Sequence, residues 1–471
     1  MNRRKFVRNT AILGAGLTLS KLPAFANYSF PVARVAAEKR NFSSKVIEDT
    51  ILQFQSGVKD KELGWLFGNC FPNTLDTTVT YTNKNGVPDT YVITGDIDAM
   101  WLRDSSAQVW PYLYFINKDK NLQKLIAGVI NRQSVCVLRD PYANAFYDDP
   151  NKTGQWKNDV TDMKPGLHER KWEIDSLCYP IRLAYRYWKL TGDTAPFDTQ
   201  WLSAIKLTLK TFREQQRKTN DGPYHFQRNT AWATDGVAMN GYGYPVKPIG
   251  LICSAFRPSD DATIFSFLIP SNFFAVVSLK QASEMVEKIA GDASTAAELT
   301  ALAAEVEQAI QTHGVIEHSQ YGKIYAYEVN GYGSYNLMDD ANVPSLLGLP
   351  YLNAISNVDP VYQNTRKILL SLNNPFFFKG KAGEGIGGPH AGKDMIWPLG
   401  IIIRGLTSDN DEEIKYCITM LKNSNVGTGF MHESFNKNDA TIFTRKWFAW
   451  ANTIFGEFLW ETYQTKPHLL V

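Results

Sequence analysis

The amino-acid sequence predicts an all-α fold in which six helical hairpins form a toroid. Segments with apolar residues at helical spacing dominate the chain after its first residues. They fall into pairs, with short links inside a pair and long, irregular links between pairs. No stretch rich in Pro, Gly or Ser divides the 471 residues. We therefore expect one domain in which inner and outer helices alternate.

The pair formed by segments 173–192 and 201–215 shows the pattern most clearly. Its first segment has apolar residues along one helix face and ends at Gly192, and its second follows after a short link. The predicted pairs, in chain order, are 105–117 with 121–137, 173–192 with 201–215, 271–290 with 293–313, 342–349 with 360–372, 393–406 with 411–424, and 446–463 with 43–67. The glycine- and aromatic-rich region 224–248 predicts a loop or a small β-hairpin.

The first residues have the layout of an export signal. Asn2–Arg8 is basic, Ala11–Leu19 is a short apolar stretch, and Ala24–Ala26 presents small residues where a signal peptidase cleaves. The adjacent Arg3 and Arg4 indicate the twin-arginine route.

We expect cleavage after residue 26, which would leave residues 27–471 as a single domain. The alternative is an N-terminal membrane anchor, but the apolar run is too short to span a bilayer. The sequence thus predicts an exported protein of the bacterial periplasm, or of the space outside the cell, without stable membrane insertion after cleavage.

Composition excludes some partners. The net charge is only +2, and there is no basic stripe, RNA-binding signature or zinc-finger spacing, so we expect no nucleic-acid partner. The 5 cysteines are scattered and none belongs to a CxxC pair, so we expect buried free thiols rather than a disulfide framework.

Clusters of polar residues lie just before the first helix of each predicted pair. If alternate helices share a direction, these links emerge at one end of the toroid and converge on one pocket. The clusters, in chain order, are Asp96, Asp98, Trp101, Arg103 and Asp104; His168, Glu169, Arg170, Lys171, Glu173 and Asp175; Arg257, Ser259, Asp260 and Asp261; Asn336, Asp339, Asp340 and Asn342; His390 and Asp394; and His432, Glu433, Asn436 and Asn438.

Helix capping explains part of this pattern. Asp or Ser before a helix is often an N-cap, and carboxylates in a first turn suit the helix dipole. Capping does not explain Arg103 beside Asp104, His432 beside Glu433, or a Trp recurring beside the acids.

The residue types indicate chemistry on sugars. Asp, Glu and Arg bind sugar hydroxyls through charge-assisted hydrogen bonds, and breaking a glycosidic bond needs one carboxylic acid and a second carboxylate. The spacing of the His residues does not match a catalytic metal site, so we expect no metal and no cofactor.

Several motifs together resemble glycoside hydrolase family 125, the exo-acting α-1,6-mannosidases. The resemblance covers nearly the whole chain after residue 26, with the motifs in the same order. It implies an (α/α)6 barrel as catalytic domain, inversion of configuration, no required metal, and a mannose-containing oligosaccharide such as an N-glycan fragment as substrate. The matching stretches are Thr94–Ser105, Lys171–Leu177, Phe256–Ala262, Met338–Pro344 and Phe430–Phe435.

The resemblance also implies residue roles. Asp260 would be the general acid, with the adjacent Asp261 as the alternative, and Glu433 the general base that activates water. Trp101 either stacks on the sugar or packs in the protein. The residues expected to bind the terminal mannose are Asp98, Trp101, Arg103, Asp104, Glu173, Asp175, Arg257, Asp261 and His432.

Two other functions remain open from the sequence. One is another glycosidase or a lyase on the same toroid, because a fold does not fix a function. The other is a non-catalytic glycan-binding protein, although binding alone does not require a separated acid and base.

Overall fold

The computed structural model describes residues 30–470. The chain divides into two units, Met1–Val32 and Ala33–Val471, and the second contains the helices and strands described below. The predicted export signal, residues 1–26, lies outside the described residues and stays a prediction. In the described part, no helix has the length and apolar character needed to cross a membrane.

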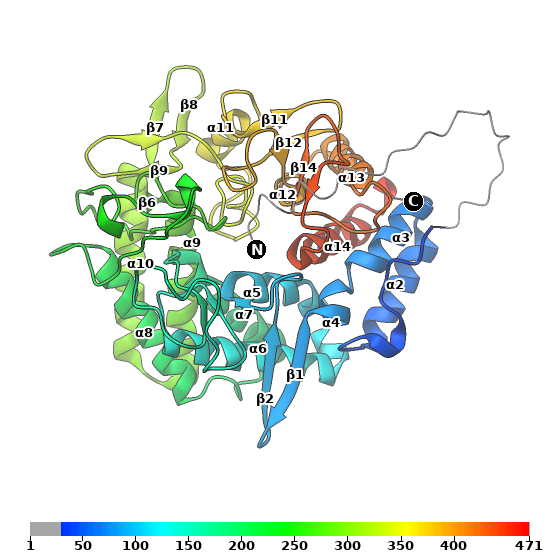
Figure 1. The fold of residues 1–471 in the computed structure, drawn as a ribbon, viewed down its shortest axis with the longest axis horizontal. Coiled ribbons are helices and arrows are strands. Elements are labelled where there is room, and N and C mark those ends of the chain that lie inside the picture. The colour runs from blue at the N-terminus through cyan, green and yellow to red at the C-terminus, as the bar shows by residue number, and fades with distance from the viewer. Residues whose placement is uncertain (1–29, 471) are drawn as a thin grey trace. The chain divides into compact units, whose positions relative to one another are not determined.

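The helices of the second unit form a ring of inner and outer helices, which confirms the predicted (α/α)6 toroid (Figure 1). Helix α7 packs on α5 and α9, while α14 packs on α5 and α12. The inner helices are α5 (Leu102–Val109), α7 (Ile174–Thr191), α9 (Ile269–Met285), α12 (Pro398–Leu406) and α14 (Ala449–Thr465). The outer helices are α2 (Lys45–Gly57), α3 (Lys61–Cys70), α6 (Lys120–Arg139), α8 (Thr199–Gln215), α10 (Ala293–His313), α11 (Pro360–Leu369) and α13 (Asp411–Ser424).

Burial explains which helices lie inside the ring. Almost every residue of α9 and of α14 is buried, including their polar Asn272, Asn452 and Glu457. Such helices need neighbours on all sides. In contrast, α13 opens with three acidic residues and buries one face only. The outer helices therefore shield the inner ones from solvent.

The predicted inner helix 342–349 is wrong, because this segment forms turns and bends. Pro344 disfavours helical backbone at the preceding residue. The backbone N–H groups of Leu346 and Leu347 donate to the buried Asp339 carboxylate, each at 2.9 Å. Tyr179 of α7 donates its hydroxyl hydrogen to Val343 O at 2.8 Å, so the turn segment occupies the place of an inner helix.

Other predicted helices differ at their ends. The segment 43–67 splits into α2 and α3, because Asp60 caps a new helix by accepting from the N–H groups of Glu62 and Leu63. The segment 105–117 changes from α5 to a 3-10 helix at Trp110, where Pro111 follows. The remaining short helices are α4 (Asn73–Thr77), a π-helical turn Val286–Ala290, and 3-10 helices Ala37–Lys39, Trp110–Lys118, Ala233–Asp235, Met239–Gly241 and Pro467–Leu469.

Short antiparallel strands join the links between hairpins. The β3-β4-β5 sheet ties the link before α5 to the link before α7, and the β13-β14-β15 sheet ties the links before α12 and α14. A third sheet, β6-β9-β10, lies at the start of α9. Their strands are β3 (Met100–Trp101), β4 (Ala145–Phe146), β5 (Leu167–Glu169), β6 (Phe267–Leu268), β9 (Glu328–Val329), β10 (Tyr335–Asn336), β13 (Met395–Ile396), β14 (Ser434–Asn436) and β15 (Phe443–Thr444).

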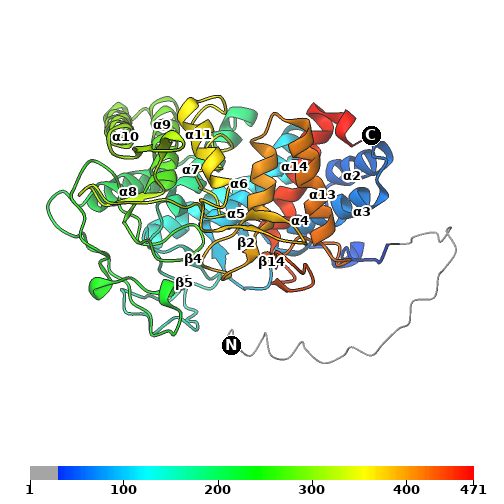
Figure 2. The same cartoon turned by 90° about the horizontal axis from the view of Figure 1, so that it is seen from above.

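These links gather on one side of the helical layer, where β4, β5 and β14 lie (Figure 2). The sheets hold neighbouring links together, so the predicted convergence of the polar clusters has a structural cause. The region 224–248, for which a loop or a small β-hairpin was predicted, is a loop with 3-10 turns. Three two-stranded hairpins complete the unit: β1 (Val79–Lys84) with β2 (Val87–Val92), β7 (Val315–His318) with β8 (Gly322–Tyr325), and β11 (Phe377–Lys379) with β12 (Glu384–Ile386).

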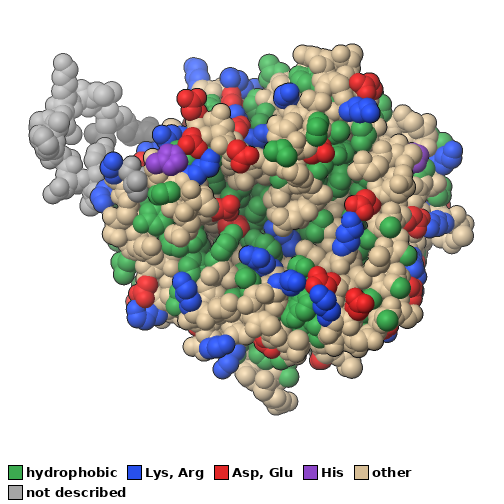
Figure 3. Space-filling model, turned by 180° about the vertical axis from the view of Figure 1, so that it is seen from behind, with side chains coloured by type: hydrophobic (Ala, Val, Ile, Leu, Met, Phe, Trp, Pro, Cys, Tyr) green, Lys and Arg blue, Asp and Glu red, His purple; other side chains and the backbone are tan. Residues whose placement is uncertain are grey.

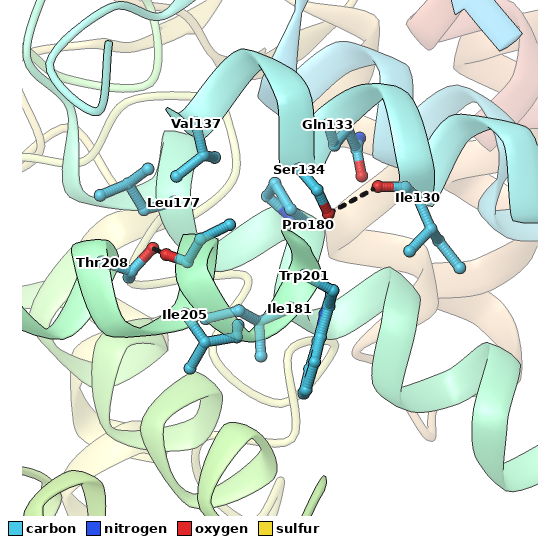
Figure 4. Close-up of a pocket in the computed structure, with 11 residues that line it drawn as sticks. Ile130, Gln133, Ser134, Val137, Leu177, Pro180, Ile181, Trp201, Ile205 and Thr208 are labelled. Carbon is cyan, nitrogen blue, oxygen red and sulfur yellow. Dashed lines mark hydrogen bonds between the residues drawn. The ribbon is translucent and has the colours of Figure 1, made fainter. Parts of the chain in front are cut away.

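The interior is tightly packed. All five cysteines are free and buried, as predicted. A cavity of about 20 Å³ lies among α6, α7 and α8, lined mainly by apolar side chains, with Ser134 Oγ donating to Ile130 O (Figure 4). This volume is close to the minimum for a single water molecule, so the cavity is a packing void rather than a substrate site.

The face opposite to that of Figure 1 carries interspersed acidic and basic side chains with hydrophobic ones between them (Figure 3).

Two helical glycines provide a test of this packing. A Cβ atom at Gly456 of α14 would lie 2.7 Å from the backbone Cα of Phe71, whereas a Cβ at Gly64 of α3 would have its nearest neighbours at 3.6 Å. We expect Gly456→Ala to destabilise the protein by about 1–3 kcal/mol through overpacking. Gly64→Ala should be neutral or stabilising by up to about 1 kcal/mol, because Ala favours helix. Thermal unfolding at one scan rate compares the two variants, and equal melting temperatures would contradict the proposed close contact.

Candidate active site

Arg103 lies at the centre of a buried group of carboxylates. Its Nη1 donates to Glu173 Oε2 at 2.5 Å and to Asp175 Oδ2 at 3.1 Å. Its Nη2 donates to Asp260 Oδ1 at 2.9 Å, and its Nε lies 3.6 Å from Asp104 Oδ2. The guanidinium group comes from the first turn of α5, and its partners come from α5 itself, from the start of α7 and from the link before α9. Three predicted clusters therefore meet at one cation.

Asp260 is held in a tight turn of the link before α9. Arg257 N donates to Asp261 O at 2.8 Å, Asp260 N donates to Arg257 O at 2.9 Å, and Phe256 forms an isolated bridge with Ala262. Asp260 has a φ of 66°, a left-handed conformation that Asp tolerates better than most residues. Its side chain is 20% exposed, whereas the side chains of Glu173 and Asp175 are 0% exposed. Of the carboxylates that hydrogen-bond to Arg103, only that of Asp260 is exposed.

A second group of buried charges supports this turn. Lys171 Nζ donates to Asp260 O at 2.7 Å and to Asp235 Oδ1 at 2.6 Å. Arg228 contacts Asp235 at 3.2 Å and Glu169 at 2.9 Å. Every one of these charges has an opposite partner, which buried charges require. The loop containing Asp235 is thereby fixed to the sheet that contains Glu169.

Asn144 connects the two groups of charges. Its Nδ2 lies 3.1 Å from Glu169 Oε2, 3.5 Å from Glu173 Oε1 and 3.4 Å from Asp260 Oδ1. Its Oδ1 accepts from Lys171 N at 3.1 Å. The Asn144 amide therefore contacts both Glu173 and Asp260, two of the carboxyl groups that also bind Arg103.

Glu433 lies in the link before α14, beside a different cation. Arg445 Nη1 is 3.3 Å from Glu433 Oε1, and Arg445 Nε donates to Asp96 Oδ1 at 2.8 Å. The neighbouring His432 stacks on Phe443 with ring centroids 3.7 Å apart. Arg445 orients the Glu433 carboxylate and ties it to the first predicted cluster.

Burial and neighbouring charges shift several pKa values. Burial raises the pKa of Asp104 to about 6, since the Arg103 and Arg445 charges offset it only in part. Burial also lowers the pKa of His432 to about 4, so this imidazole is neutral near pH 7. The charges of Arg103 and Arg445 both act on the Asp104 carboxyl group, so the two cations of the site influence one acid.

Several polar atoms in this region have no hydrogen-bond partner within residues 30–470. A buried donor or acceptor without a partner costs free energy unless a ligand or water satisfies it. They are Trp101 Nε1, Arg103 Nε, Asp175 Oδ1, Arg257 Nη2, Trp397 Nε1 and His432 Nδ1. These atoms are buried, so a ligand could reach them only after the surrounding side chains move.

Trp101 belongs to the wall rather than to the main core. It packs only with Ala99 and Ala145 in a small separate cluster, against Ile97. Its ring meets His168 edge-on with centroids 5.0 Å apart. The position leaves both predicted uses of Trp101, stacking and packing, available.

The remaining predicted residues lie around this core. Arg257 is buried and donates to Glu328 Oε1 at 2.7 Å, holding the link against β9. Asp261 is buried and accepts from Thr234 Oγ1 at 2.7 Å. Asp98 is exposed and accepts from Lys152 Nζ at 2.7 Å, so no contact joins it to Arg103.

The sequence prediction did not select Asn144, Arg228 or Arg445. Arg445 lies just before α14, the same place that defined the other clusters, so the positional rule could have found it. Asn144 follows the outer helix α6 and Arg228 follows the outer helix α8, each far from the start of the next inner helix, and no local pattern distinguishes them. Only the tertiary contacts reveal them.

Within residues 30–470, no group of three or more His, Cys, Asp or Glu side chains is arranged to hold a metal ion.

Comparison with known proteins defines the class. Residues 60–460 match the family described as metal-independent alpha-mannosidase, GH125. The chain belongs to this family and is a glycoside hydrolase, an α-mannosidase. This confirms the family predicted from the motifs.

Individual relatives agree with this assignment. A solved Streptococcus pneumoniae structure, reported with metal-independent alpha mannosidases as a non-productive substrate complex with α-1,6-mannobiose, is 40% identical. The match covers 90% of this chain and 100% of that chain, with a TM-score of 0.87. The meiotically up-regulated gene 157 protein of Schizosaccharomyces pombe is 42% identical over 95% of this chain and 91% of its own length. A wild-type glycosidase structure, 10% identical with a TM-score of 0.51 over 90% of this chain and 99% of that chain, shares the fold.

Removing the Arg103 charge should destabilise the protein strongly. Arg103→Met leaves buried carboxylates unpaired, so we expect a loss of about 3–5 kcal/mol. The matched control is Arg213→Met, because Arg213 pairs with Glu298 where both side chains are about half exposed; its effect should be about 0–1 kcal/mol. Thermal or urea unfolding of both variants measures the difference, and a similar loss in the two would refute the central role of Arg103.

Proposed function

We propose that this α-mannosidase is exo-acting, cleaves α-1,6 linkages at non-reducing terminal mannose, and inverts the anomeric configuration. The observation that carries the proposal is the likeness to the pneumococcal structure with α-1,6-mannobiose, at 40% identity over 90% of this chain. The partly exposed Asp260 carboxyl group beside Arg103 supports a site that binds sugar hydroxyl groups.

Asp260 is the general acid in this proposal. Its exposure of 20% lets it reach a glycosidic oxygen, whereas Glu173 behind it is fully buried. The alternative acid, Asp261, is buried and already accepts a hydrogen bond from Thr234. Asp261, Glu173 and Asp175 are then supports, while Trp101, Arg103, Asp104, Arg257 and His432 supply groups for the sugar.

Glu433 is the general base. Asp260 lies in the link of the third predicted hairpin and Glu433 in that of the sixth, which places them on opposite sides of a six-hairpin ring. An inverting glycosidase needs its two carboxyl groups about 6.5–9.5 Å apart, so that a water molecule fits beside the sugar. Opposite links suit this separation better than neighbouring ones.

The reaction then takes one step. Asp260 gives its proton to the glycosidic oxygen, and the bond from C1 to that oxygen breaks with the electron pair leaving on oxygen. Glu433 takes a proton from water as the water oxygen attacks C1 from the opposite face. The products are β-mannose and a glycan with a free hydroxyl group.

The predicted export signal indicates the compartment in which the enzyme would act. We propose that the enzyme acts after export, in the periplasm or outside the cell, on fragments of N-glycans or mannans. The basic, apolar and small-residue stretches of residues 1–26 support export. The pneumococcal relative is described in connection with the processing of N-linked glycans, which supports this substrate class.

Replacing the base should abolish turnover without unfolding the protein. For Glu433→Gln we expect mannose release from α-1,6-mannobiose to fall about 10²–10⁴-fold, because Gln accepts no proton from water. The control is Glu412→Gln, an exposed position in the first turn of α13, which should keep full activity. NMR of the wild-type reaction should show the β-anomer first. A first-formed α-anomer, or a fully active Glu433→Gln variant, would contradict the mechanism.

Replacing the acid should depend on the leaving group. For Asp260→Asn we expect α-1,6-mannobiose hydrolysis to fall about 10²–10⁴-fold, while α-mannosyl fluoride, whose fluoride leaves without a proton, should lose much less. Asp261→Asn is the comparison: as a support it should affect both substrates alike. If instead Asp261→Asn spares the fluoride and Asp260→Asn does not, Asp261 is the acid.

A further inference from the structure

The carboxyl groups of Glu173 and Asp260 lie next to each other on the same two donors. Arg103 donates to both, at 2.5 Å and 2.9 Å, and Asn144 Nδ2 contacts both, at 3.5 Å and 3.4 Å. Two adjacent carboxyl groups can form a hydrogen bond with each other only when one of them carries a proton. Their placement on shared donors therefore suits a pair that holds one proton between them.

Asp260 is the exposed member of this pair and Glu173 is the enclosed one. The Glu173 side chain is 0% exposed, and its Oε2 also accepts from Ser176 Oγ at 2.8 Å. Glu173 therefore has no route to a sugar, and any proton that it holds reaches a substrate only through Asp260.

The surrounding charges favour keeping one proton on the pair. The cations that act on Asp260 are Arg103 and Lys171, together with His390 when it is protonated. Acids that act on the pair are Asp104, Glu169 and Asp175, and His168 faces them as well. Arg228 pairs with Glu169, and also with Asp159 and Asp235. With both carboxylates of the pair ionised, the acids of this network would outnumber Arg103, Lys171 and Arg228 in a buried space.

The pKa shifts agree on where the proton lies. Burial and the neighbouring Asp260 raise the pKa of Glu173 well above its usual range, and Arg103 offsets them only in part. Burial alone would raise the pKa of Asp260 too, but the Arg103 and Lys171 cations lower it below its usual range. These opposite directions favour Glu173 over Asp260 as the carboxyl group that holds the proton.

We propose that Glu173 is a positioning residue that stores the catalytic proton and passes it to Asp260 when a glycosidic oxygen binds. This inference rests on the proposed function, in which Asp260 is the general acid. The proton moves from the Glu173 carboxyl to the Asp260 carboxylate and from Asp260 to the glycosidic oxygen as its bond to C1 breaks. Glu433 ends protonated by the attacking water, and exchange with solvent returns the proton to the pair.

The test is the pH profile of kcat/KM for α-1,6-mannobiose in Glu173→Gln. Gln keeps the shape and a hydrogen bond to Asp260 but stores no proton, so Asp260 alone, beside Arg103 and Lys171, loses its proton at lower pH. We expect the basic limb to move down by about one pH unit or more, and kcat/KM at pH 7 to fall at least about tenfold. Hydrolysis of α-mannosyl fluoride should stay within about threefold of the wild type, because it needs no proton.

Asp175→Asn is the control for losing a carboxyl group beside Arg103. It leaves Glu173 in place, so the basic limb of its pH profile should move by less than half as much. An equal shift would mean that charge alone acts, and the proposal would fail. If Glu173→Gln lost the same activity on α-1,6-mannobiose and on α-mannosyl fluoride, and its basic limb did not move, Glu173 would have only a structural role.

Glu173→Asp guards against a folding defect. It keeps a carboxyl group but moves it away from Asp260. We expect the basic limb of its pH profile to move down by less than in Glu173→Gln, with full activity on α-mannosyl fluoride. A basic limb that does not move, together with reduced activity on α-1,6-mannobiose, would overturn the proposal. Wild type that releases no mannose from α-1,6-mannobiose would overturn the proposed function itself. Active wild type with unshifted Glu173 variants overturns only the proton store.

Discussion

The Arg103 guanidinium group lies buried among carboxyl groups from separate parts of the chain, and the geometry of the site depends on it. Asp104, Glu173, Asp175 and Asp260 all lie within 3.6 Å of its nitrogen atoms. Buried carboxylates are costly unless a cation and hydrogen bonds compensate them. The planar fork of an arginine fixes two partners at once, so the position of α5 helps to set that of Asp260, the proposed acid.

The site contains more buried acidic side chains than buried basic ones, and this excess of acidic groups suits the chemistry of a glycosidase. A glycosidase needs one carboxyl group that keeps its proton and another that is ionised. Near Arg103, crowding of acids favours a retained proton. Glu433 lies apart from that crowd, beside Arg445 at 3.3 Å. One ring of helices thus creates two different environments for chemically similar side chains.

The toroid supplies the separation between them. Short sheets such as β3-β4-β5 and β13-β14-β15 join consecutive links on one side of the helical layer. The links therefore border a common space instead of ending as independent loops. The turn segment near Pro344, held by the Asp339 carboxylate, takes the place of an inner helix without interrupting this arrangement.

The sequence by itself determined the helical toroid, the family, and the links that carry the site. Helical spacing and position relative to a helix start are local properties, so residues such as Arg103, Asp260 and Glu433 could be selected from them. A helix was predicted at 342–349 and does not form, because the Asp339 carboxylate accepts from backbone N–H groups of this segment and so competes with helix formation. Only the tertiary structure decided that Asp98 points to Lys152, that Asn144 bridges two carboxyl groups, and that Glu173 lies enclosed behind Asp260. These facts depend on distances between residues far apart in the chain, and no local pattern encodes such distances.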